Sequence, residues 1–148
     1  IRQILGLRST TGTELHCLPP DYHTLINAAQ RPCKPKLKPP HLTVAARARS
    51  KHAHRGETDQ FFGVVTGSTQ QKNDDAGRIV REMLRDAVWM NIHVFGGAQA
   101  PILEMRNAQG YGMRFMADWS TDPYAPKDVT FRGFLEPQME DGFEKRWR

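Results

Sequence analysis

The chain has 148 residues, of which 39 % are hydrophobic, so it is long enough to bury one hydrophobic core. No apolar run approaches the roughly 20 residues of a transmembrane helix, so we expect no membrane partner. The net charge of +5 favours anionic partners mildly, and two cysteines do not make the disulfide framework of a small secreted domain. The sequence predicts no metal site and no cofactor, and it leaves the oligomeric state open.

Residues 1–40 are predicted to form an N-terminal extension, followed by a core domain over residues 41–148. Residues 1–13 contain arginine, serine and threonine but no acid, which is typical of the tail of an organellar transit peptide; an arbitrary chain boundary is the alternative. We therefore expect an intracellular protein, either cytoplasmic or organellar (mitochondrial).

A Pro- and Lys-rich linker follows a short helix that is predicted from Pro19–Asp21 to Ala29. Residues 31–40 contain four prolines and four basic residues, which favours an extended and poorly packed segment.

The next helix is predicted to be capped by Thr43 and to end at Arg55. Residues 31–55 contain eight Lys or Arg residues and no acid. Two interpretations are open: a solvated flank, or a patch that contacts phosphates. In the second interpretation the candidate nucleic-acid patch consists of Arg47, Arg49, Lys51 and Arg55.

A long amphipathic helix is predicted over residues 74–90, because apolar side chains recur there at intervals of three and four. Asn73 or Asp74 is expected to cap it. Strands are predicted over residues 91–95, 102–106, 111–116 and 129–135. Together these elements predict a single α+β domain in which an antiparallel sheet packs against the long helix, with a mixed sheet as the alternative.

The hairpin between the second and third of these strands decides which side chains share a face. A four-residue loop over residues 107–110 would place Arg106 opposite Tyr111 and Glu104 opposite Met113. Glu104 would then lie on the same face as Phe115, and Arg114 on the other face. A slip of one residue would change these neighbours.

Several short motifs together resemble an uncharacterised protein family of plants, protists and some bacteria. They are Lys51-His52-Ala53-His54-Arg55, Gly110-Tyr111-Gly112-Met113-Arg114 and Phe131-Arg132-Gly133-Phe134-Leu135-Glu136-Pro137, supported by Lys72-Asn73 and Trp89-Met90-Asn91-Ile92-His93. The resemblance covers about residues 42–148, and Phe115 stands where this family has tryptophan. It implies a shared fold and pocket but no particular reaction.

Polar residues recur within these motifs and need either partners or a ligand. The leading hypothesis is a pocket for a small anionic ligand bearing a phosphate or carboxylate, whether or not the protein is an enzyme. Its candidate ligand-binding residues are His52, Arg55, Lys72, His93, Glu104 and Arg114. An internal ion-pair network, such as Glu104 with Arg106 or Arg114, is one alternative. The other is a basic nucleic-acid-binding module or an assembly subunit of an organellar ribonucleoprotein or other large complex.

Overall fold

The computed structural model describes residues 16–55, 61–94 and 100–137, and the backbone alone for residues 53–55. Three helices precede a four-stranded antiparallel sheet in the order β1-β2-β3-β4. The helices are α1 (Tyr22–Ala29), α2 (Val44–Arg55) and α3 (Thr69–Asp86), and the strands are β1 (Trp89–His93), β2 (Ile102–Arg106), β3 (Gly112–Asp118) and β4 (Lys127–Leu135). The predicted single α+β domain with a long helix on an antiparallel sheet is confirmed.

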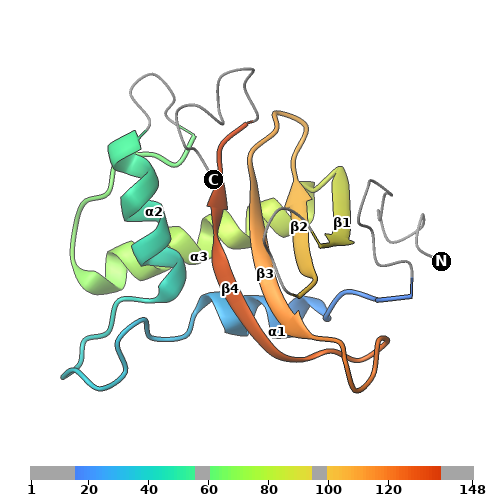
Figure 1. Ribbon diagram of the computed structural model, residues 1–148. Helices are drawn as coiled ribbons and strands as arrows, with labels where there is room; N and C mark the ends of the chain where they lie inside the picture. Colours follow the sequence, from blue (N-terminus) through green and yellow to red (C-terminus); the bar gives the residue numbers. More distant parts are fainter. Residues whose placement is uncertain (1–15, 56–60, 95–99, 138–148) are drawn as a thin grey trace.

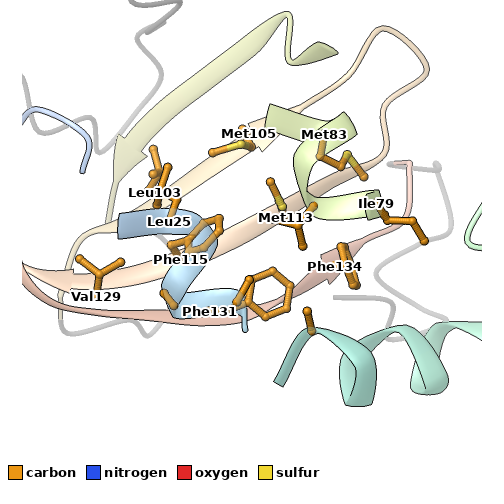
Figure 2. Packing of buried hydrophobic residues seen from close by; sticks show 14 of the residues in the cluster. Leu25, Ile79, Met83, Leu103, Met105, Met113, Phe115, Val129, Phe131 and Phe134 are labelled. Atoms are coloured by element: carbon orange, nitrogen blue, oxygen red, sulfur yellow. The ribbon is translucent and has the colours of Figure 1, made fainter. Parts of the chain in front are cut away.

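One face of the sheet packs against the helices. In Figure 1, α1 and α3 lie behind the sheet and α2 lies beside β4. Figure 2 shows Leu25 of α1 near Phe115 of β3, and Ile79 and Met83 of α3 near Met113. All five side chains belong to one buried cluster. Burial of such side chains contributes about 1.5–3 kcal/mol each, so this cluster fixes how the sheet meets the helices.

The long helix α3 exists as predicted, but it begins and ends several residues earlier. Ser68 caps it, because the Ser68 hydroxyl accepts a hydrogen bond from the Gln71 N–H at 3.1 Å. The helix ends at Asp86, and the chain then enters β1, where Trp89 pairs with Arg106. The prediction missed the polar first turns because they carry no apolar periodicity.

Asn73, predicted as a helix cap, instead lies inside α3 and holds the start of α2. Its side chain accepts a hydrogen bond from the Thr43 N–H at 2.9 Å and donates one to the His41 carbonyl at 2.8 Å. Thr43 caps α2 as predicted, since its hydroxyl accepts from the Ala46 N–H at 3.1 Å. Asn73 therefore connects the N-terminal ends of two helices that pack together.

The segment between α1 and α2 is held at both ends. The Cys33 N–H donates to the Leu42 carbonyl, and the Val44 N–H donates to the Arg31 carbonyl, each at 2.9 Å. Arg31 also donates to the Val129 carbonyl of β4 at 2.9 Å. The prolines and lysines between these ends are exposed, but the ends are part of the fold. The division at residue 40 stays a prediction.

The predicted register of the β2–β3 hairpin is wrong by one residue. Arg106 pairs with Gly112, and Glu104 pairs with Arg114. The cause is Gly110, whose φ of 93° lets a shorter loop close, with the Asn107 N–H donating to the Tyr111 carbonyl at 2.8 Å. The shift puts Glu104, Arg106 and Arg114 on one face, and Met113 joins the hydrophobic core on the other.

β4 also departs from simple alternation. Arg114 pairs with Gly133 while Phe115 pairs with Phe131, so Arg132 is the extra residue of a β-bulge. Phe131 and Phe134 consequently both reach the core, and Gly133 lies on the face of Arg114, whereas simple alternation would put it on the face of Phe131. Arg132 is exposed at the bulge, and its Nη1 lies 3.7 Å from the sulfur of Met116 on β3.

Candidate functional site

A charged cluster lies on the sheet face opposite the helices. It consists of His93 of β1, Glu104 and Arg106 of β2 and Arg114 of β3, and we call it the Glu104 cluster. Glu104 is 4 % exposed, and its two carboxylate oxygens accept hydrogen bonds from Arg106 Nε at 3.0 Å and Arg114 Nε at 2.8 Å. His93 Nε2 lies 3.6 Å from Glu104 Oε1. Strand order and register alone bring these side chains together.

The electrostatics of the cluster fix its charge state. Burial acts to raise the pKa of Glu104, but the guanidinium groups of Arg106 and Arg114 outweigh it and hold the pKa below its ordinary value. Burial also lowers the pKa of His93, and the Glu104 carboxylate offsets this only in part. Near neutral pH the cluster therefore combines an ionised carboxylate with a neutral imidazole and two cations.

Arg106 links this cluster to the end of β4. Its Nη1 donates to the Gly110 carbonyl at 2.7 Å and to the Glu136 carbonyl at 3.1 Å. The Glu136 carboxylate in turn lies 2.9 Å from His52 Nδ1 in α2. His52 is 5 % exposed and contacts the ring of Phe62 with centroids 4.9 Å apart. A chain of polar contacts thus runs from the sheet to α2.

A second feature is a hollow between α2 and β4, which we call the α2–β4 groove. Its volume is about 330 Å³. It is lined by three exposed cations, Arg47, Lys51 and Arg132, and by apolar side chains that include Phe131 and Phe134. The buried side chain of His52 also reaches its wall.

The predicted ligand-binding residues do not form one pocket. His93, Glu104 and Arg114 come together in the Glu104 cluster, whereas His52 belongs to the α2–β4 groove. Lys72 lies in the first turn of α3, and the side chain of Arg55 lies outside the described residues. The ion pairs of Glu104 with Arg106 and Arg114, considered as an alternative from the sequence, are both present.

The predicted nucleic-acid patch divides in a similar way. Arg47 and Lys51 are exposed in the α2–β4 groove, but Arg49 is 4 % exposed and lies in the interior. Its guanidinium donates to the Phe62 carbonyl at 2.7 Å and to the Val64 carbonyl at 3.1 Å. Arg49 therefore holds the chain after α2 in place and is not on the surface that a phosphate would meet.

The candidate ligand-binding set from the sequence left out three residues that the geometry brings forward. Arg106 was considered only as an ion-pair partner of Glu104, with which it shares a face because the two lie two residues apart on one strand. Glu136 was considered as a member of the motif over residues 131–137, without a charge partner. Arg132 gave no signal, because its position depends on the bulge.

Comparison with known proteins identifies one family. The family model described as "CdiA C-terminal tRNase toxin domain" matches residues 33–136, well over half of the chain. No curated protein and no solved structure matches. This match overturns the resemblance to an uncharacterised family of plants, protists and bacteria, whose motifs were weak singly and had no activity attached.

The match also overturns the leading functional hypothesis, a pocket for a small anionic ligand with no assigned activity. A tRNase domain implies an RNA partner, so the nucleic-acid alternative agrees better with the family than the leading hypothesis does. The organellar assembly in that alternative is not supported. The transit-peptide interpretation rested on residues 1–13, which lie outside the described residues, and a toxin domain gives an organellar location no support. Within the described ranges, no helix is long and apolar enough to cross a membrane.

Proposed function

Because the chain belongs to the CdiA C-terminal tRNase toxin domain family, we propose that it cleaves tRNA, and that the Glu104 cluster is its active site. The observation that carries the assignment of the site is the Glu104 carboxylate bonded to two guanidinium groups, with an imidazole 3.6 Å away. Cleavage of an RNA strand through its own 2′-hydroxyl uses a base for that hydroxyl and cations for the phosphate, and this cluster contains both kinds of group.

The proposed reaction begins at His93. Its neutral imidazole takes the proton of a ribose 2′-hydroxyl, and the 2′-oxygen attacks the adjacent phosphorus. A new bond forms between O2′ and phosphorus while the bond between phosphorus and O5′ breaks, and the leaving oxygen takes a proton from solvent. The products are a 2′,3′-cyclic phosphate and a 5′-hydroxyl. His93 suits the base role because its lowered pKa keeps it unprotonated near pH 7.

The other members of the cluster act through charge. The Glu104 carboxylate stabilises the imidazolium that forms on His93, and it orients both arginines through their Nε atoms. Arg114 balances the negative charge that builds up on the phosphorus centre, since a guanidinium suits bidentate phosphate contact. Arg106 is a positioning residue, because its Nη1 is bonded to the carbonyls of Gly110 and Glu136.

The experiment compares tRNA cleavage by the wild-type chain with His93→Gln and Arg114→Lys. Loss of the base is expected to lower kcat by about 10²–10⁴-fold, and loss of bidentate charge stabilisation by about 10²–10³-fold. Glu82→Gln is the matched control, because the Glu82 side chain is 44 % exposed on α3 and its ion pair with Arg78, at 3.4 Å, is exposed at both ends.

Thermal unfolding of each variant separates loss of activity from loss of fold. If a folded His93→Gln chain cleaves tRNA at the wild-type rate, His93 is not the base of the reaction. A wild-type chain that leaves tRNA intact would overturn the proposed function itself.

A further inference from the structure

The α2–β4 groove is separate from the Glu104 cluster, and the reaction proposed above does not use it. Its rim carries Arg47 and Lys51 from α2 and Arg132 from β4. The spacing of four residues puts Arg47 and Lys51 on one face of the helix. Arg132 also lines the hollow, and its Nη1 lies 3.7 Å from the sulfur of Met116 on β3. Three cationic residues from two elements therefore line one concave surface.

Within the part of the chain that the structure describes, no acid forms an ion pair with these cations. None of the described residues that line the groove is acidic. Among the described residues, none of the three cations forms an ion pair, and Arg132 contacts only the sulfur of Met116, at 3.7 Å. By contrast, the buried Arg49 is held by the carbonyls of Phe62 and Val64. An anion in the groove would meet exposed cationic residues and, among the described lining residues, no carboxylate.

The floor and size of the groove define the ligand further. Val44, Ala48, Phe131 and Phe134 give it an apolar lining, against which a nucleobase or ribose can pack. A volume of about 330 Å³ lies at the small end of the range for ligand sites, which suits one nucleotide rather than a longer stretch. Cations at the rim over an apolar floor match the chemistry of a nucleotide.

The groove also lies near the Glu104 cluster. Gly133, one of its lining residues, is the register partner of Arg114 on the neighbouring strand. Directly paired residues of antiparallel strands have Cα atoms about 4.5–5.5 Å apart. A strand of RNA that crosses the edge of β4 can therefore reach both surfaces.

We propose that the α2–β4 groove is a substrate subsite that binds one nucleotide of the RNA outside the cleaved bond, with Arg47, Lys51 and Arg132 contacting its phosphates. This inference rests on the proposed function. It assigns these three residues to binding and not to the chemical step, so their loss should raise KM for tRNA and leave kcat nearly unchanged.

The main test uses a triple variant, Arg47→Gln, Lys51→Gln and Arg132→Gln. Its control is Arg78→Gln, Arg81→Gln and Arg85→Gln, which removes the same charge from the exposed face of α3. Binding of tRNA is measured on a His93→Gln background so that the RNA stays intact. We expect the groove variant to bind about tenfold or more weakly at 0.1 M salt, with a log–log salt slope shallower by about 2. Equal losses in both variants would overturn the subsite, because they would report net charge alone.

A second measurement does not depend on cleavage. Adenosine 5′-monophosphate is titrated into the wild-type chain and followed by amide NMR. The subsite predicts saturable shifts at Ala48 and Gly133 that disappear in the groove variant. Shifts confined to other residues would overturn it. A wild-type chain that cleaves no RNA but shows these shifts would refute the proposed function and leave the nucleotide-binding groove standing.

Discussion

Replacement of Glu104 by glutamine should destabilise the fold more than any other single loss of charge in the sheet. Glu104 is 4 % exposed, and the side chains of Arg106 and Arg114 are only 14 % and 16 % exposed. The amide keeps one acceptor oxygen but leaves two largely buried cations without a counter-charge. Removal of one partner from a buried ion pair costs about 3–5 kcal/mol, which is a large part of a typical total stability of about 5–15 kcal/mol.

Urea unfolding at pH 7 measures this loss as a lower midpoint at an unchanged slope. Glu82→Gln is the matched control, because its pair with Arg78 is exposed at both ends and should contribute only about 0–1 kcal/mol. If Glu104→Gln costs no more than Glu82→Gln, the carboxylate does not hold the two arginines, and the described geometry of the cluster is wrong.

Three further predictions concern stability. Arg49→Lys should lower the free energy of unfolding by about 1–3 kcal/mol, because one ammonium group cannot replace the guanidinium that bonds to two carbonyls. Chemical unfolding measures this loss, and an unchanged midpoint would contradict the prediction. Ser68→Ala should lower the free energy of unfolding by about 1 kcal/mol, because α3 loses its cap. The unfolding midpoint should fall slightly, and an unaffected midpoint would mean that the cap contributes nothing. The folded-state pKa of His93 lies below 6.5, so below pH 6.5 the unfolded chain binds more protons than the folded chain, and the free energy of unfolding should decline as pH falls. His93→Gln should flatten that part of the pH profile, and a profile identical to that of the wild type would refute the prediction.

The fold class could be predicted because its signals are local. Apolar residues at helical spacing predicted α3, and the prolines before Asp21 predicted the start of α1. The ends of α3 were harder to predict from the sequence, because Ser68 and the polar turn after it carry no periodic pattern. Local patterns therefore gave the elements but not their limits.

The candidate site was only partly predictable, because it depends on a register that one residue decides. Gly110 closes a shorter loop than the one assumed, and this puts Arg114 on the face of Glu104 instead of the opposite one. The composition of α2 likewise could not reveal that Arg49 points inward while Arg47 and Lys51 point out. Such choices are made by tertiary packing, which neither charge nor periodicity records.

The chemistry of the cut ends of tRNA tests the central claim most directly. Purified chain is incubated with tRNA, and the fragments are analysed by mass spectrometry. If a 2′-hydroxyl activated by His93 attacks the phosphorus, one fragment should end in a 2′,3′-cyclic phosphate and the other should begin with a 5′-hydroxyl. Fragments that carry a 5′-phosphate and a free 3′-hydroxyl would contradict the account, because water and not the ribose would then have attacked the phosphorus.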